Sequence, residues 1–245
     1  MVERLLIGGE WVEGRGNTYE LRNQYDGSLL ARVPLATPAE VEAALASTVA
    51  AFSVVSSMPA HRRATLLYAT ADLISRDREA LGRSIAQEGG KALKFALGEV
   101  DRASQTFRFA GEEAKRIHGE TVPMDAALGA ERRLGFWLRS PRGPVVAISP
   151  FNFPLNLVAH KVAPALAAGN SVLLTPASST PLTALHLGRL LTEAGWPAGA
   201  INIITGSGGT VGEALTADPR IALVSFTGSA AVGRGILARA GLKRV

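Results

Sequence analysis

The stretch Ser149-Pro150-Phe151-Asn152-Phe153-Pro154 follows a short apolar run, residues 145–148, and precedes a segment of helical character. The apolar run predicts a buried strand. Pro154 suits the first turn of a helix, where a missing N–H is tolerated. Asn152 is therefore expected at the carboxyl end of a strand, where open α/β sheets bind ligands. Its amide could donate a hydrogen bond to a developing oxyanion there; the alternative is that Asn152 only completes the turn.

From residue 145 onward, segments of strand length alternate with segments of helix length. Strands are predicted near 145–149, 171–175, 201–205 and 221–226, and helices near 154–168, 181–194, 208–217 and 229–240. Such alternation produces a parallel sheet with helices on both faces. The sequence therefore predicts an α/β protein with a Rossmann-like open parallel sheet.

The first half of the chain predicts two short strands around Gly8-Gly9, a third strand over 28–35, and then helices. Thr37-Pro38-Ala39-Glu40 is a capping box with proline at the first helical position. Further helices are expected over 60–88 and 92–118, followed by a loop over 119–130 and a half-exposed strand over 133–140. We expect the N-terminal helices to pack around the same sheet, so that residues 1–245 form one domain.

Composition narrows the function classes. The chain has 245 residues, 47% of them hydrophobic and 19% charged, which is ordinary for a globular protein. Its net charge of +5 is dispersed and forms no basic stripe with aromatic residues, so nucleic-acid binding is not expected. No unbroken apolar run predicts a membrane span, and no signal peptide is recognisable. A cytoplasmic location is the default expectation, and no metal site is predicted.

Two glycine-bearing turns follow predicted strands. Residues 206–212 have the spacing G-x-G-x-x-x-G, which differs from the dinucleotide fingerprint G-x-G-x-x-G. Gly228-Ser229 opens a helix that contains Gly233. Small residues at a helix N-terminus can hold a phosphate through backbone N–H groups and the helix dipole. The alternative is that these glycines serve only turns and packing.

Taken together, several segments resemble the aldehyde dehydrogenase superfamily over nearly the whole chain. They are the Asn152 stretch, Lys161 within residues 160–170, Thr180-Pro181-Leu182, and Phe226-Thr227-Gly228-Ser229. Details such as residues 122–125 and 152–157 are most similar to the branch acting on lactaldehyde, succinate semialdehyde and phosphonoacetaldehyde.

The resemblance implies NAD- or NADP-dependent oxidation of a small aldehyde to a carboxylic acid. Asn152 would hold the oxyanion, and Lys161 would lie near the coenzyme and the proton-relay path. The residues implied to contact the coenzyme are Ser149, Pro150, Phe151, Asn152, Thr175, Ser178, Gly208, Gly212, Phe226, Thr227, Gly228, Ser229 and Val232.

The chain departs from the family pattern at the strand end that follows residue 174. Thr175 stands where members typically carry a lysine that contacts the adenosine ribose or a 2′-phosphate. Ser178 stands where NAD-preferring members often carry a glutamate that repels this phosphate. The choice between NAD and NADP is therefore left open.

The resemblance also implies that the catalytic domain is absent. The family's nucleophile is a cysteine, and this chain has none; the segment bearing the general-base glutamate is also missing. The chain alone is therefore expected to be inactive, and a non-catalytic dinucleotide-binding module or pseudoenzyme is the alternative function. Residues 131–142 match the start of the oligomerisation arm, although a plain edge strand fits the same pattern. A homo-oligomer, or association with the missing catalytic half, is expected.

Overall fold

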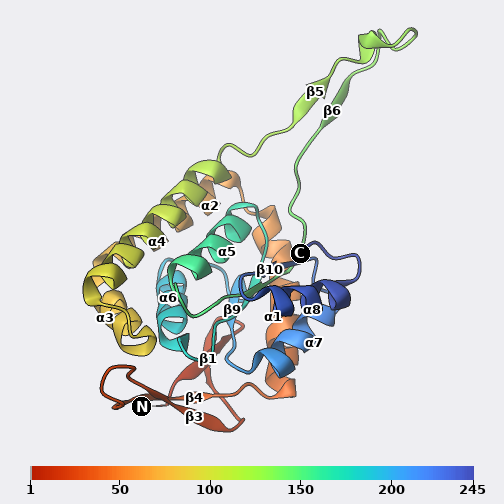
Figure 1. Ribbon diagram of the computed structural model, residues 1–245. Helices are drawn as coiled ribbons and strands as arrows, with labels where there is room; N and C mark the ends of the chain where they lie inside the picture. The colour runs from red at the N-terminus through yellow and green to blue at the C-terminus, as the bar shows by residue number, and fades with distance from the viewer. Residues whose placement is uncertain (1) are drawn as a thin grey trace.

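A six-stranded sheet in the order β10-β7-β8-β9-β1-β2 forms the centre of the computed structural model, which describes residues 2–245 apart from the side chain of Thr210 (Figure 1). The strands are β1 (Arg4–Ile7), β2 (Glu10–Glu13), β7 (Val145–Ile148), β8 (Val172–Thr175), β9 (Ile201–Ile203) and β10 (Leu223–Phe226). The last four are parallel, which confirms the predicted α/β sheet.

The strand pairing at one edge of the sheet is antiparallel. β1 and β2 form a hairpin, and β1 joins β9 in antiparallel fashion, with Leu6 opposite Ile203. Gly8 and Gly9 both have positive φ, 65° and 87°, which a two-residue hairpin turn of this hand requires. The glycine pair therefore explains why the chain reverses here instead of crossing over.

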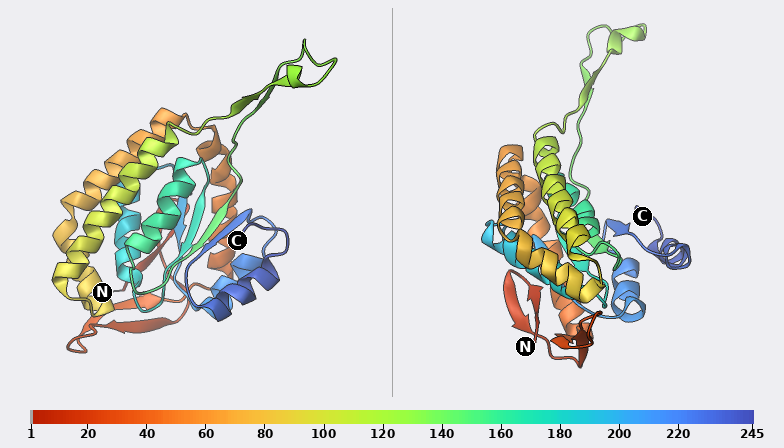
Figure 2. Two further views of the ribbon diagram at one scale, coloured as in Figure 1. Left: turned by 45° about the horizontal axis from the view of Figure 1, so that its top comes forward. Right: turned by 60° about the vertical axis from the view of Figure 1, so that its left-hand side comes forward.

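Eight helices surround the sheet in the described part of the chain. They are α1 (Pro38–Ser57), α2 (Ala60–Arg76), α3 (Arg78–Gly89), α4 (Leu93–Ala114), α5 (Asn156–Ala167), α6 (Pro181–Glu193), α7 (Glu213–Ala217) and α8 (Ala230–Ala240). The views in Figure 2 show helices on both sides of the sheet.

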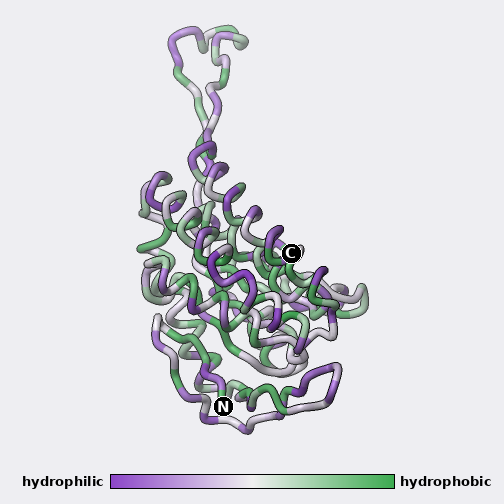
Figure 3. Tube along the Cα trace, turned by 90° about the vertical axis from the view of Figure 1, so that its left-hand side faces the viewer, coloured by the Kyte–Doolittle hydropathy of each residue, from purple (hydrophilic) through white to green (hydrophobic). Residues whose placement is uncertain are grey.

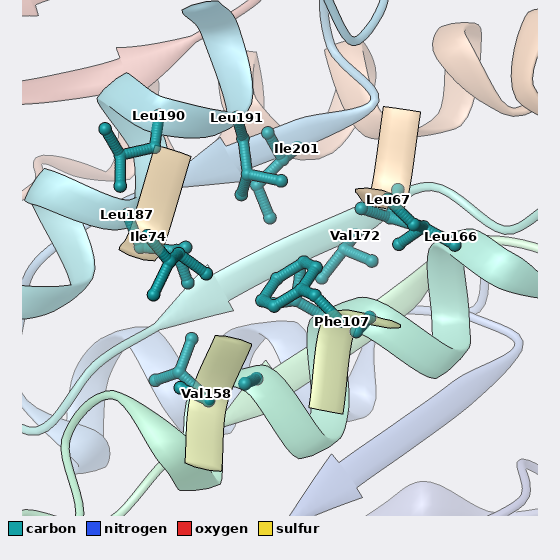
Figure 4. Packing of buried hydrophobic residues seen from close by; sticks show 14 of the residues in the cluster. Leu67, Ile74, Phe107, Val158, Leu166, Val172, Leu187, Leu190, Leu191 and Ile201 are labelled. Carbon is teal, nitrogen blue, oxygen red and sulfur yellow. The ribbon is translucent and has the colours of Figure 1, made fainter. Parts of the chain in front are cut away.

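Alternation along the strands divides the core between the two faces. In β8, Val172 and Leu174 pack with α2 to α6, whereas Leu173 packs with α1, α7 and α8. The larger cluster is centred on Phe107 of α4 and includes Leu67 of α2 and Leu166 of α5 (Figure 4). Both faces of the strands are thus covered, as their continuous apolar sequence predicts.

Three helix boundaries differ from the prediction. The helix expected over 60–88 breaks at Asp77, whose carboxylate binds Arg76 and His186 at 2.7 and 2.8 Å and whose backbone leaves the helical region. Residues 208–217 form a wide π-helical turn, η2 (Gly208–Gly212), before α7, because four of the seven residues over 206–212 are glycine. The helix expected from residue 154 begins two residues later, at Asn156. Pro154 still lies within its first turn, because Leu157 N–H donates to the carbonyl of Phe153 at 3.0 Å.

Helix α1 is long and apolar enough, by length and composition alone, to cross a membrane. In the fold its inner face packs on the sheet. Thr48 accepts a 2.8 Å hydrogen bond from the side chain of Asn202, and its carbonyl accepts one of 2.6 Å from Ser171. The packing of α1 on the sheet explains its apolar composition, and the composition alone is weak evidence for a membrane span.

Two small hairpins lie outside the main sheet. β3 (Thr18–Arg22) pairs with β4 (Leu29–Pro34); β3 was not predicted. β5 (Glu120–Val122) pairs with β6 (Gly135–Trp137), and the single turn η1 (Met124–Ala126) lies between them. The expected loop over 119–130 therefore contains a strand. This hairpin projects far from the body (Figure 1), so residues 133–140 are not an edge strand of the main sheet.

Candidate functional site

A cavity of about 490 Å³ lies at the carboxyl ends of β7 and β8, enclosed by η2, α7 and α8. Its lining residues are Ile148, Thr175, Gly208, Gly209, Gly212, Glu213, Ala231, Val232, Gly235, Ile236 and Arg239. Most of them are apolar or lack a side chain. The cavity therefore suits a flat, largely apolar group with polar atoms at its edges.

Two hydroxyl groups beside this cavity make no hydrogen bond within the described residues. The Oγ1 atom of Thr175 and the Oγ atom of Ser149 are buried and have no hydrogen-bond partner among the described residues. Their backbones are adjacent, since Ser149 N–H donates to the carbonyl of Thr175 at 3.3 Å. Buried polar groups are normally satisfied, so these two indicate a site built to receive a polar ligand.

The glycines of η2 leave room for that ligand. A Cβ placed on Gly208 or Gly209 would meet nothing within 4 Å, and one on Gly212 would only reach Ile148 at 4.0 Å. These three glycines line the cavity, and their lack of side chains leaves this part of its wall open.

The N-terminus of α8 lies next to the cavity and carries the second glycine turn. Ser229 caps the helix, because its Oγ accepts from Val232 N–H at 3.3 Å. A Cβ on Gly228 would approach the ring of Phe226 to 2.5 Å, and one on Gly233 would approach it to 3.4 Å. The glycines therefore let the ring of Phe226 pack directly against the start of the helix.

Lys161 reaches this region from α5. Its Nζ donates to the Oγ1 of Thr227 at 2.5 Å, and Thr227 N–H in turn donates to the carbonyl of Ile148 at 3.2 Å. Lys161 is buried, and burial lowers its pKa from 10.5 to about 8. The structure thus places a weakly basic, buried amine between α5 and the strand end of β10.

We expect Lys161→Met to raise the free energy of unfolding by about 1 kcal/mol at pH 7, because it removes a buried charge. Between pH 8 and 10.5 the unfolded wild type binds more protons than the folded one, so wild-type stability rises with pH there. The advantage of the variant should therefore shrink above pH 8. Chemical denaturation at several pH values measures this, with exposed Lys94→Met as the control. A less stable variant, or a difference independent of pH, would contradict it.

The turn that carries Asn152 lies outside the cavity. Phe151 and Asn152 are exposed, and the backbone carbonyl of Asn152 accepts a 2.8 Å hydrogen bond from Lys91. Ser178 also lies elsewhere, in a neighbouring groove against β3, where its carbonyl accepts from the Tyr19 hydroxyl at 2.6 Å. Of the thirteen residues implied to contact the coenzyme, Thr175, Gly208, Gly212 and Val232 line the cavity itself.

Sequence reasoning missed two charged residues at the cavity. Arg239 of α8 and Glu213 of α7 both line it, and their side chains approach to 3.3 Å. Val232, Ile236 and Arg239 follow one another at helical spacing, so the inward face of α8 could have been extended to Arg239. Glu213 gave no comparable signal, because the π-helical turn before it was not predicted.

Two buried carboxylates lie behind the strand ends. Glu88 of α3 accepts from Leu182 N–H and Thr183 N–H at the start of α6, at 2.8 and 3.0 Å, and also from the Thr183 hydroxyl. Burial raises the pKa of Glu88 to about 7, these hydrogen bonds oppose the rise, and nearby Glu99 adds to it. Within the described residues the side-chain hydrogen bonds of Glu88 all go to the start of α6, which supports a structural role for this carboxylate.

Comparisons with known proteins agree with this geometry. The aldehyde dehydrogenase family model matches residues 11–245. The 3-sulfolactaldehyde dehydrogenase of Priestia aryabhattai is 42% identical over 241 residues, which cover 98% of this chain and 50% of that protein.

Solved structures of this family superimpose closely. An NADP-dependent glyceraldehyde-3-phosphate dehydrogenase from Bacillus halodurans, complexed with NADP, gives a TM-score of 0.96 at 36% identity, covering 100% of this chain and 52% of that one. A betaine aldehyde dehydrogenase from Staphylococcus aureus, in complex with NAD⁺, gives 0.94 at 32% identity, covering 100% and 50%.

The fold is an α/β architecture with a cavity at the carboxyl ends of its parallel strands. The chain belongs to the aldehyde dehydrogenase family. It spans about half the length of the curated relatives it matches.

Proposed function

We propose that this chain forms the coenzyme-binding part of an NAD(P)-dependent aldehyde dehydrogenase and supplies the oxyanion-binding Asn152. The observation that carries the proposal is the buried Oγ1 of Thr175, which has no hydrogen-bond partner in the described part of the chain and lies beside a glycine-lined cavity at the sheet's carboxyl edge. In the resembled family this edge binds the coenzyme. The oxidation of an aldehyde by the whole enzyme belongs to the proposal.

Each part of the site has a distinct task in this proposal. The cavity holds the base, the hydroxyl of Thr175 donates to or accepts from the ribose, and the free N–H groups at the start of α8 bind the phosphates. Asn152 donates its amide to the oxyanion that forms when a nucleophile attacks the aldehyde. The nicotinamide, when bound, supplies the hydride acceptor. Lys161 holds the Thr227 turn in place through its 2.5 Å hydrogen bond.

The two positions at which the resembled family distinguishes the coenzymes, Thr175 and Ser178, carry no charge in this chain. Thr175 is uncharged, and Ser178 brings no carboxylate that would repel a 2′-phosphate. We therefore propose that NAD⁺ and NADP⁺ bind with similar, low affinity. Calorimetric titration of the chain with NAD⁺, NADP⁺ and AMP tests the proposal: saturable heat for all three is expected, and no heat with any of them would refute it.

A binding module that uses a dinucleotide without oxidising an aldehyde is the second candidate, favoured by the absence of cysteine from the chain. The two candidates differ when a separate polypeptide carrying a family catalytic domain is added. The first predicts that coenzyme reduction with an aldehyde appears on mixing, whereas the second predicts none. The cytoplasmic location stays a prediction.

We further propose that the projecting β5–β6 hairpin mediates assembly. Hydrophobic residues lie among hydrophilic ones along it (Figure 3), and Leu128, Leu134, Phe136 and Leu138 are between 60% and 102% exposed. Such unpartnered apolar surface and short strand edges favour association.

Replacement of Leu134 and Leu138 by serine should therefore lower self-association of the chain by about tenfold or more. Sedimentation velocity across a range of concentrations measures it. Val54→Ser and Leu237→Ser, at exposed apolar positions on α1 and α8, are the matched control. A wild-type chain that stays monomeric, or equal effects of the two double variants, would contradict the role of the hairpin.

A further inference from the structure

Residues of α4 and of the α3–α4 connection contact the backbone of the turn that carries Asn152. Glu99 of α4 is completely buried, and its Oε1 accepts from the backbone N–H groups of Leu155 and Asn156 at 2.9 and 3.1 Å. These are N–H groups at the start of α5, which have no partner within the helix. A charged carboxylate thus fixes the point at which the turn becomes a helix.

Lys91, between α3 and α4, completes the attachment. Its Nζ forms an ion pair with the other carboxylate oxygen of Glu99 and donates to the carbonyl of Asn152 at 2.8 Å. The same atom lies 3.9 Å from the centre of the Phe153 ring. One ammonium group therefore contacts three successive features of the turn: the Asn152 carbonyl, the Phe153 ring, and the carboxylate that binds the next two N–H groups.

The Lys91–Glu99 ion pair is not needed merely to fill the space between the helices and the turn. Two apolar side chains of similar volume would fill the same space, and a buried ion pair is weak evidence for stability. An apolar pair, however, would leave the N–H groups of Leu155 and Asn156 and the Asn152 carbonyl without these partners. The charged pair instead fixes three backbone groups in one geometry.

We propose that Lys91 and Glu99 are positioning residues that hold the Asn152 amide in the orientation needed for the reaction. The role in the reaction rests on the proposed function. Asn152 has no side-chain hydrogen bond within the described residues, so its direction is set through its backbone. Glu88 makes the equivalent contacts at another helix start, since its carboxylate accepts from N–H groups at the start of α6, the helix that follows β8.

The test uses the chain labelled with ¹⁵N-asparagine and compares wild type with Lys91→Met and Lys91→Arg. The side-chain amide resonance of Asn152 should shift or broaden in Lys91→Met, and Lys91→Arg, which keeps the charge and the contact with the ring, should restore most of it. Exposed Lys94→Met on α4 is the matched control and should leave the resonance unchanged. Thermal unfolding of each variant shows whether the fold persists. Lys91 is chosen over Glu99 because its side chain is partly exposed, whereas that of Glu99 is completely buried.

Nucleotide affinity supplies the second measurement. Lys91→Met should bind NAD⁺ about tenfold more weakly than wild type and bind AMP within about twofold, because only the dinucleotide reaches the Asn152 turn. A parallel loss for AMP, or an unchanged Asn152 resonance in a folded Lys91→Met chain, would overturn the positioning role. If wild type binds neither nucleotide, the proposed function fails, while the Asn152 resonance still decides whether Lys91 positions the turn.

Discussion

The 245-residue chain by itself is expected to reduce no NAD⁺ or NADP⁺ with small aldehydes at a rate above the no-protein control. The chain contains no cysteine, and His118 and His186 bind the carbonyl of Arg116 and the carboxylate of Asp77 rather than a serine. Covalent capture of the aldehyde, and the hydride transfer that follows it, would lack their first step. Because enzymes accelerate reactions by about 10⁶-fold or more, the expected loss is complete on the scale of the assay.

Absorbance of the reduced coenzyme measures this rate with succinate semialdehyde, lactaldehyde and glyceraldehyde. An intact family member in the same buffer serves as the positive control. A rate for this chain that scales with its concentration and disappears in Asn152→Ala would contradict the expectation and show that another group acts as the nucleophile. A rate that survives Asn152→Ala would point to a contaminating enzyme.

The second large effect is expected from filling the cavity. Gly208→Trp places an indole where an added Cβ meets nothing within 4 Å, in the wall of the cavity beside β8. We expect the affinity for NAD⁺ and for AMP to fall by about 100-fold, because the indole occupies the space assigned to the base. The free energy of unfolding should change by less than about 1 kcal/mol, as no packed neighbour is displaced.

Gly98→Trp is the matched control for this change. Gly98 lies on the exposed side of α4, and a Cβ there also meets nothing within 4 Å. It should leave nucleotide affinity unchanged. Equal affinities for wild type and Gly208→Trp, in a chain that binds nucleotide, would place the base outside this cavity.

Much of the fold was predictable because short apolar segments of strand length alternate with segments of helix length along the second half of the chain. Strands β7, β8, β9 and β10 are short, mainly apolar segments separated by helix-length segments, and this pattern leaves few alternatives to a parallel sheet. The hairpin of β1 and β2 was also predicted from its Gly8-Gly9 turn, but its attachment to β9 was not. That contact joins residues nearly 200 positions apart, and no local pattern encodes it.

The site was predictable where it depends on turns and unpredictable where it depends on distant side chains. The glycines of η2 and the start of α8 were identified from their positions after strands. Lys91 and Glu99 precede Asn152 by more than fifty residues and belong to a different helical layer. Only the packing of α4 against α5 brings them to the turn, so a sequence pattern cannot reveal the pair.

The most direct test of the central claim, that the carboxyl edge of this sheet binds a dinucleotide, is amide mapping of the chain during titration with NAD⁺. The account predicts saturable changes concentrated at Thr175, Gly212, Ser229 and Val232, with smaller ones at Asn152. Residues of the β3–β4 hairpin and the projecting β5–β6 hairpin should stay unchanged. Saturable changes centred elsewhere, or none up to the highest soluble concentration of NAD⁺, would contradict it.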